Sequence, residues 1–346
     1  MDQRQKVAIL RVLREAEGPL GSGRLAEKIA MYGIDLSARA VRLHLEALCA
    51  RGLVTPAVRG RGGGRSITPA GVAEINDALV LDRVAMTAGK VDDLAWRLSY
   101  DPASGGGEVV LNLSTVHATL LRPALAAMLP VFEAGLGMGR YACVAEPGTR
   151  VGAFTVPAGQ VAIGTVCSLT ANGVLLSRRV PVTSRFGGVL ELVDGEPVRF
   201  TDVIYYEGTS LDPLEVFIKG QLTCVRDVAR TGCGRIGVGF REVPTSALET
   251  VVATFDELEQ RGLGRILLLG KPNRPVLGFP VPEGRTGLVV AAGLNPLAAV
   301  EEEGIHAQNF ALSELYDVAG LEPYSDLARR YNLPPGGEVQ KRAKPE

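Results

Sequence analysis

The sequence predicts two unequal domains: an N-terminal winged helix-turn-helix, then a larger mixed α/β or α+β domain built on a mixed sheet. Its 346 residues exceed one typical domain. Apolar residues recur at helical spacing at first, but strand-like runs alternate with helices after about residue 83. Charge is uneven too, because residues 1–70 hold 12 Lys/Arg against 6 Asp/Glu within a chain of net charge −1. We expect domains at 1–80 and 81–327 and a disordered tail at 328–346, which is rich in Pro, Gly and charge.

Three short helices are expected in the basic head. The first covers Val7 to Leu13, where apolar residues repeat at helical spacing before Gly18-Pro19. Ser22 is placed to cap the second, which can end at Gly33. Ser37 repeats the capping signal for a third helix, Ala38 to Arg51, whose apolar stripe is Val41, Leu45 and Leu48.

A basic hairpin should follow the third helix. Leu53-Val54 and the segment VRGRGGGRSIT indicate two short strands joined by a glycine tip, and Thr68 can cap a fourth helix that begins at Pro69. In a winged helix the third helix enters the major groove and wing arginines reach phosphates or the minor groove. We therefore expect double-stranded DNA as a partner, although such a head could instead mediate protein contact. The DNA-binding candidates are Ser37, Arg39, Arg42, His44, Arg59, Arg61 and Arg65.

Helix signals in the second domain are caps and prolines. They predict helices at Thr119 to Ala134, from Asp212-Pro213, from a capping box at Ser246 to Glu249, and from Asn295-Pro296 to Gly304. Strands are expected between them at 189–193, 234–242, 265–269 and 287–292. Asn172-Gly173 is a strong hairpin signal, so 161–170 is expected to pair with 174–180. Hairpins mixed with crossover helices favour the mixed sheet.

Two polar turns suggest a ligand pocket. Tyr206 to Pro213 and Gly293 to Pro296 each carry a strand into a helix, where first-turn amides and hydroxyls can hold an anion. Helix capping alone would also explain Asp212, and Arg241 could bind a ligand carboxylate or simply form a salt bridge near Glu242. The effector-binding candidates are Cys167, Thr170, Thr209, Ser210, Asp212, Arg241 and Asn295.

Several other functions are disfavoured. Five cysteines without a C-x-x-C pair and three scattered histidines argue against a metal site or a disulfide framework. Gly232 to Gly237 spells G-x-G-x-x-G but follows a helix and opens a strand, so Gly232 is interpreted as a helix C-cap. We expect no enzyme and no cofactor, and, because the N-terminus has no signal peptide or membrane span, a cytoplasmic protein. The alternative is a thiol-dependent enzyme or redox sensor using Cys167 or Cys143.

Four segments carry a family resemblance: GTVCSLTANGVLL, FGGVLELVDGEPVRFTDVIYYEGTSLDPLEVFI, GRIGVGFREVP and GLVVAAGLNPLAAVEEEGI. Together they resemble the regulatory domain of NrpR, a family of nitrogen-responsive transcriptional repressors, across roughly residues 85–320. The resemblance implies a homodimeric, ligand-responsive repressor of nitrogen-assimilation genes that binds palindromic operators and is released by 2-oxoglutarate, with no catalysis. Archaeal members often carry two such domains in tandem, and the motifs occur once here.

Overall fold

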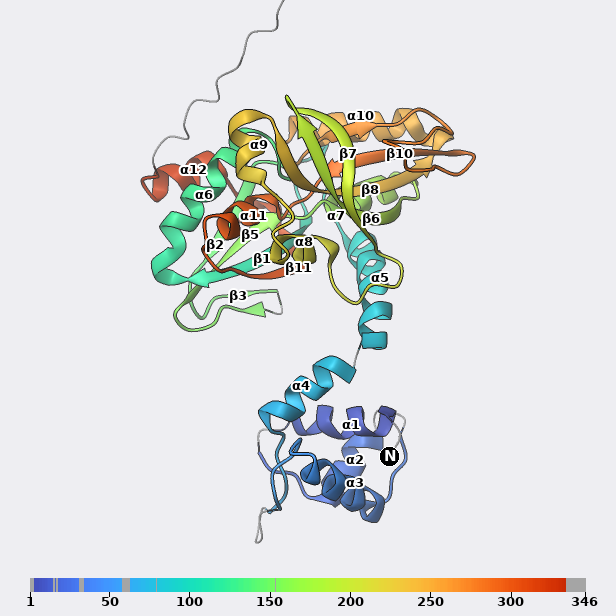
Figure 1. Cartoon of the computed structure of the whole chain (residues 1–346), viewed down its shortest axis with the longest axis vertical. Coiled ribbons are helices and arrows are strands. Elements are labelled where there is room, and N and C mark those ends of the chain that lie inside the picture. The colour runs from blue at the N-terminus through green and yellow to red at the C-terminus, as the bar shows by residue number, and fades with distance from the viewer. Residues whose placement is uncertain are drawn as a thin grey trace, which may run out of the picture. The chain divides into compact units, whose positions relative to one another are not determined.

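The computed structural model describes residues 3–14, 16, 18–30, 34–57, 63–78, 80–152 and 154–333. The chain divides into two compact units, Met1–Val84 and Ala85–Glu346 (Figure 1). The boundary falls inside α5, Val80–Arg97, four residues from the predicted 80/81 boundary. Each unit has its own hydrophobic core.

The first unit contains α1 (Gln3–Arg14), α2 (Ser22–Ala30), α3 (Ala38–Ala50) and α4 (Pro69–Ala78). Ser37 caps α3 as predicted, because its hydroxyl accepts a hydrogen bond from the amide of Ala40. Thr68 likewise accepts from the amide of Gly71 at the start of α4. The predicted helix stop at Gly33 lies outside the described residues. The stripe on α3 is fully buried and joins Ile9, Leu10, Leu25 and Ile29 in the core.

The wing strands pair as single bridges. Val54 faces Ile67 and Leu20 faces Arg65, both antiparallel, so the segment between α1 and α2 adds a third short strand. The amide of Thr55 donates to the carbonyl of Ser66 at 2.8 Å. The base of the predicted hairpin is therefore present, while its tip, residues 58–62, lies outside the described part of the chain.

The second unit is built on two five-stranded sheets. The first has the order β11 (Gln308–Asp317), β1 (Glu108–His117), β5 (Gln160–Val166), β2 (Tyr141–Ala145), β12 (Glu322–Pro323). The second has the order β7 (Glu196–Tyr205), β6 (Thr183–Val193), β8 (Gly234–Pro244), β10 (Arg285–Ala291), β9 (Ile266–Leu269). A two-stranded pair, β3 (Arg150–Val151) and β4 (Phe154–Thr155), extends beside the first sheet.

Every strand pair in the described chain is antiparallel. The α+β prediction is confirmed, but the expected mixed sheet is wrong. The error came from reading strand–helix–strand order as crossovers between neighbouring parallel strands. In the folded chain the strand after α7 or α11 joins the other sheet, as β6 does after β5. The strand after α6 or α10 returns to the same sheet, but an antiparallel strand separates it from the strand before the helix.

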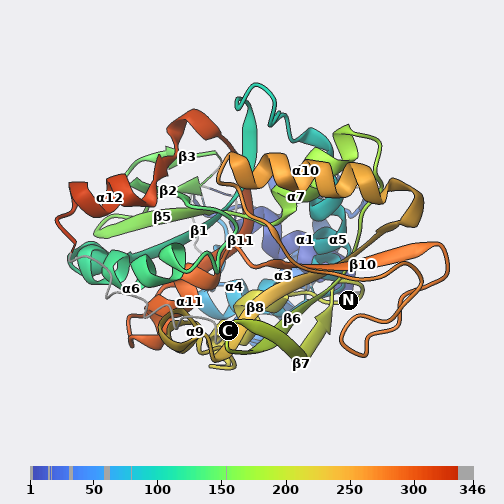
Figure 2. The same cartoon turned by 90° about the horizontal axis from the view of Figure 1, so that it is seen from above.

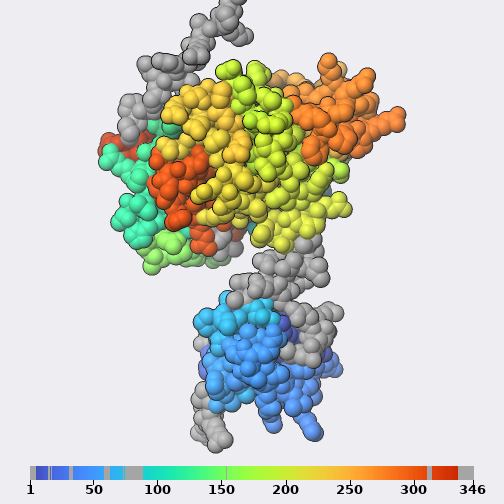
Figure 3. Space-filling model, viewed as in Figure 1, coloured from blue at the N-terminus to red at the C-terminus, as the bar shows by residue number. Residues whose placement is uncertain are grey.

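Helices cover both faces of the sheets (Figure 2). One core contains side chains of α6 (Leu121–Glu133), α8 (Pro213–Lys219), α9 (Val225–Thr231) and α11 (Asn295–Glu302). The other contains side chains of α5, α7 (Leu169–Ser177) and α10 (Leu248–Gln260). Strands β1, β5 and β10 are buried along nearly their whole length, as expected for strands covered on both faces. By contrast β7, yellow-green in Figure 3, is an edge strand that is largely exposed.

The second unit contains the same order of strands and helices twice. The first pass is β1, a 3-10 turn, α6, β2, β5, α7, β6, and the second is β8, a 3-10 turn, α10, β9, β10, α11, β11. Helices α6 and α10 each have 13 residues and follow three-residue 3-10 turns. The last strand of each pass pairs with the first strand of the other, β6 with β8 and β11 with β1. The unit is therefore two intertwined structural repeats.

The predicted hairpin at Asn172-Gly173 is wrong, because both residues lie inside α7. A Cβ on Gly173 would come within 2.8 Å of Leu98 Cβ and 2.9 Å of the carbonyl oxygen of Ala95. The glycine thus permits close packing of α7 against α5. Asn172 is buried and donates to Ser184, so its amide is used in a tertiary contact rather than a turn.

Other boundary predictions gave mixed outcomes. Gly232 caps α9 with φ of 77° and β8 begins at Gly234, which confirms that this glycine motif ends a helix and opens a strand. The capping box at Ser246 is wrong, because 245–247 forms a 3-10 turn and α10 starts at Leu248 without a side-chain cap. The tail expected from 328 begins as helix, since α12 spans Tyr324–Arg330, and residues 334–346 lie outside the described part. Within the residues described, no helix has the length and apolar character needed to cross a membrane.

Candidate functional site

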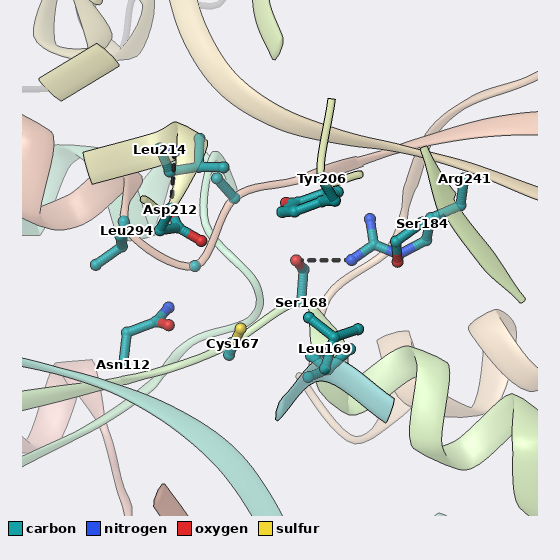
Figure 4. A pocket seen from close by; sticks show the side chains of 13 residues that line it. Asn112, Cys167, Ser168, Leu169, Ser184, Tyr206, Asp212, Leu214, Arg241 and Leu294 are labelled. Atoms are coloured by element: carbon teal, nitrogen blue, oxygen red, sulfur yellow. Dashed lines mark hydrogen bonds between the residues drawn. The ribbon is translucent and has the colours of Figure 1, made fainter. Parts of the chain in front are cut away.

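A small pocket with a cavity volume of about 30 Å³ lies where the two repeats meet (Figure 4). Two of its walls are the turns that lead from β5 into α7 and from β10 into α11, at 167–169 and 292–294. These turns occupy the same place in each repeat. The other lining residues come from α5, β1, β6, the segment after β7, the start of α8, and β8: Val91, Asn112, Ser184, Tyr206, Asp212, Leu214 and Arg241.

The two turns are anchored in the same way. The amide of Cys167 donates to Val110 on β1 at 2.7 Å, and the amide of Ala292 donates to Gly237 on β8 at 3.0 Å. Gly293 packs so tightly that a Cβ would stand 2.0 Å from the carbonyl oxygen of Val166. The two turns are equivalent in their backbone contacts, but the side chains that face the cavity differ. The pocket therefore has two chemically different ends.

Arg241 forms the cationic end. Its side chain is 4% exposed, and it donates to Asn172 Oδ1 at 2.6 Å, to Ser168 Oγ at 2.8 Å and to the carbonyl of Gly239 at 3.3 Å. Burial lowers the pKa of Arg241 from its ordinary value, opposed by Tyr206 and Cys167. Across the described chain no carboxylate pairs with Arg241, whereas the neighbouring Glu242 pairs with Arg185 at 3.4 Å. A buried guanidinium held by neutral acceptors is suited to bind an anionic group.

Asp212 forms the acidic end. Its Oδ1 accepts hydrogen bonds from the amides of Leu214 at 2.8 Å and Glu215 at 3.3 Å, which confirms the predicted cap of α8. Burial raises the pKa of Asp212 to about 6, although these two amide hydrogen bonds favour the ionised form. The carboxyl group is therefore mostly ionised at neutral pH and titrates just below it.

Cys167 and Tyr206 lie between the two ends and are neutral near pH 7. Burial raises the pKa of the Cys167 thiol to about 11, and burial likewise raises the pKa of Tyr206 well above its usual value. The thiolate is the reactive form of cysteine, so Cys167 is placed as a small packing residue and a weak donor. Cys143 has a pKa of about 11 for the same reason.

Three of the predicted effector-binding residues come together in this pocket: Cys167, Asp212 and Arg241. The other four do not line it. Thr170 and Asn295 occupy equivalent positions in α7 and α11, and their side chains hydrogen-bond to the backbone of Val110 and Gly237 respectively. Thr209 hydrogen-bonds to the backbone of Leu211, and Ser210 lies in the same loop outside the pocket lining.

Four polar lining residues were not among the predicted effector-binding residues, although Tyr206 begins one of the two predicted polar turns: Asn112, Ser168, Ser184 and Tyr206. Asn112 had a signal, because it is a polar residue inside the apolar run VVLNLSTV. Ser168 directly precedes α7 and lies between two predicted residues, Cys167 and Thr170. The position of Ser184 follows from the pairing of β6 with β8, which places it opposite Arg241.

The head presents a separate candidate surface on α3. Arg39 and Arg42 are exposed beside Leu43, whose side chain is 60% exposed, while His44 is half-buried and burial lowers its pKa. Ser37 is used in the cap, and Arg65 donates to the carbonyl of Thr55 at the base of the wing. The remaining predicted DNA-binding residues, Arg59 and Arg61, lie outside the described residues.

A winged helix followed by an α+β domain with a charged pocket is the layout of a transcription regulator with a sensor domain. Comparison with known families identifies both parts. Residues 84–323 match the model of NrpR regulatory domains NRD1 and 2, and residues 7–75 match the ribonuclease R winged-helix domain. The chain belongs to the NrpR family, as its sequence motifs indicated.

Curated relatives bear the same family name. The chain is 33% identical to global nitrogen regulator NrpRI of Methanosarcina mazei, over 91% of this chain and 96% of that protein. It is 30% identical to global nitrogen regulator NrpR of Methanococcus maripaludis, over 93% of this chain but only 56% of the longer relative. A solved nitrogen repressor-like protein from Methanococcus jannaschii aligns with a TM-score of 0.58 at 27% identity, over 69% of this chain and 98% of that one.

Proposed function

We propose that this chain is a DNA-binding transcriptional repressor of nitrogen-assimilation genes whose operator affinity is set by a small anionic effector, 2-oxoglutarate, bound in the pocket beside Arg241. The family membership and the names of its relatives support a role in nitrogen regulation. The observation that carries the effector proposal is the buried guanidinium of Arg241, which has hydroxyls beside it and no carboxylate partner in the described chain.

The chemistry of the pocket suits a keto acid. A guanidinium can grip a carboxylate with two parallel hydrogen bonds. Ser168, Ser184 and Tyr206 supply hydroxyl groups around it for the adjacent keto oxygen. Leu169, Leu214 and Leu294 contribute apolar surface that can contact the methylene groups. A thiol-dependent function is less well supported, because both buried thiols have raised pKa values.

We further propose that α5 transmits effector binding to the head. Val91 of α5 lines the pocket, and α5 continues back along the chain to Val80, directly after α4. A coupling free energy of ~1–3 kcal/mol between effector and operator would change DNA affinity ~5–150-fold. In a homodimer, movement of both α5 helices would alter the separation of two recognition helices, which must match half-sites one or more helical turns apart.

The test measures both binding events. Operator DNA is selected by the purified protein from a random-sequence pool, and its affinity is measured by fluorescence anisotropy with and without 2-oxoglutarate, with succinate as a control. Calorimetry measures effector binding to wild type, Arg241→Lys and the exposed control Arg199→Ala, whose arginine pairs with Glu191 on the sheet surface. We expect the loss of effector binding in Arg241→Lys alone, because an ammonium cannot reproduce the guanidinium fork. Equal effector binding by all three proteins would refute this assignment of the site.

A further inference from the structure

The pocket carries opposite charges that do not neutralise each other. Arg241 and Asp212 both line it, yet they do not form an ion pair within 4 Å, and neither perturbs the pKa of the other. Figure 4 shows Ser168 and Tyr206 between them, with the guanidinium and the carboxylate on opposite sides of the cavity. A buried cation and a carboxylate that face one cavity from separate ends are suited to a ligand that also has two opposite charges.

Asp212 keeps one oxygen for such a ligand. Both cap hydrogen bonds of α8 use Oδ1, and the described residues supply no hydrogen bond to Oδ2. In Figure 4 an oxygen of this carboxylate points into the cavity. An ionised carboxylate there attracts an ammonium and repels a second carboxylate.

We infer that the pocket also binds a small α-amino acid, with its carboxylate on Arg241 and its ammonium on Asp212, in competition with the keto dicarboxylate. This inference rests on the proposed function only in taking this pocket as the effector site. Leu169, Leu214 and Leu294 then face the aliphatic part of the amino acid. Asp212 becomes the residue that distinguishes an amino acid from a keto acid, since the two differ in whether an ammonium or a keto oxygen adjoins the carboxylate.

The protonation state of Asp212 should give the two ligand classes opposite pH dependences. With its pKa at about 6, Asp212 is ionised at pH 7.5 and favours the ammonium, and it is largely neutral at pH 5 and no longer repels a second carboxylate. The ionisable groups around it are Cys167, Tyr206, Arg241 and Glu215 of α8. Cys167 and Tyr206 stay neutral across this range. His306 pairs with Glu301 of α11, which also pairs with Lys219 at the C-terminal end of α8. Because these pairs are kept in Asp212→Asn, they do not distinguish the variant from wild type.

The experiment compares two probes, L-glutamine and 2-oxoglutarate, by calorimetry at pH 5.5 and 7.5. L-Glutamine is used because its side chain is uncharged and it carries one carboxylate. The variant is Asp212→Asn, since asparagine still caps a helix and the fold should persist. Asp202→Asn on the surface strand β7 is the matched control.

We expect L-glutamine to bind wild type more tightly at pH 7.5 than at 5.5, and to bind Asp212→Asn about 10- to 100-fold more weakly at pH 7.5. 2-Oxoglutarate should bind the variant at least as tightly as wild type and should displace L-glutamine. Binding of 2-oxoglutarate without L-glutamine binding would overturn this inference and leave the proposed function intact. Equal L-glutamine affinity in wild type and Asp212→Asn would also overturn it. Binding of L-glutamine alone would support the inference and refute the 2-oxoglutarate proposal, and binding of neither would refute both.

Discussion

Gly173 provides a direct test of the packing that replaced the predicted hairpin. The perturbation is Gly173→Ala in α7. Its Cβ would lie 2.8 Å from Leu98 Cβ, 2.9 Å from the carbonyl oxygen of Ala95 and 3.0 Å from Leu98 Cδ1. Two of these atoms belong to the backbone or to a Cβ and cannot rotate away, so α5 and α7 must separate.

The magnitude follows from a matched pair of variants. Gly89→Ala on α5 adds the same methyl group where no atom lies within 4 Å. It should stabilise the protein by up to ~1 kcal/mol, because alanine favours a helix over glycine. Gly173→Ala receives the same helix benefit but incurs an overpacking cost of ~1–3 kcal/mol. The difference between the two variants isolates that cost, and corresponds to roughly 2–12 °C in Tm at ~2–4 °C per kcal/mol.

Unfolding in urea, followed by far-UV circular dichroism, measures the effect. Fluorescence is unsuitable, because the one tryptophan in the sequence, Trp96 on α5, is already 75% exposed in the folded protein. The reasoning is refuted if Gly173→Ala is as stable as Gly89→Ala, because a turn or a loose helix contact at Gly173 would accommodate the added methyl group.

Three further predictions concern pH, DNA and thiols. Because the pKa of Asp212 rises from 3.8 to about 6 on folding, its contribution to stability is fully present below pH 4 and is lost as pH increases to 6. The free energy of unfolding of Asp212→Asn, relative to that of wild type, should therefore increase by up to ~3 kcal/mol between these pH values in urea titrations. Stability profiles that run parallel for the two proteins would contradict this. Arg42→Ala should weaken binding to selected operator DNA by ~1–3 kcal/mol and leave binding to unrelated DNA nearly unchanged; an unchanged operator affinity in anisotropy would exclude α3 as the reading helix. Iodoacetamide at pH 8 should leave Cys143 and Cys167 unmodified in the folded protein, as checked by mass spectrometry, and alkylation at either that changes DNA binding would favour the thiol-dependent alternative.

Local signals in the sequence predicted the head well. The cap at Ser37, the stripe on α3 and the start of α4 at Pro69 are all found where the pattern placed them. A three-helix unit has mainly local contacts, so caps and helical spacing are enough to define its elements. The same is true of Asp212 and Gly232, whose capping roles depend only on a few adjacent residues.

Tertiary context overrode the sequence signal at α7. Asn172-Gly173 has the chemistry of a tight turn, yet the glycine is needed for helix packing and the asparagine for holding Arg241. A helix buried on all sides has no amphipathic spacing to reveal it, and residues Leu169 to Leu175 are all buried. The error placed α7 in a hairpin and added to the expectation of one mixed sheet in place of two intertwined repeats.

By itself the sequence determined the family, the winged helix, the two polar turns, one of which supplies Asp212, and Arg241 as a separate candidate, because these depend on motifs and on neighbours along the chain. Only the tertiary structure decided which polar residues share a cavity. Exchange of β6 and β11 between the repeats brings 167–169 against 292–294, and the pairing of β6 with β8 sets Ser184 beside Arg241. Thr170 and Asn295 sit one residue beyond those turns, and their side chains bind backbone instead of facing the pocket. Whether these side chains face the pocket or bind the backbone depends on contacts between residues about 60 positions apart, and the spacing of residues along a strand or helix does not encode such contacts.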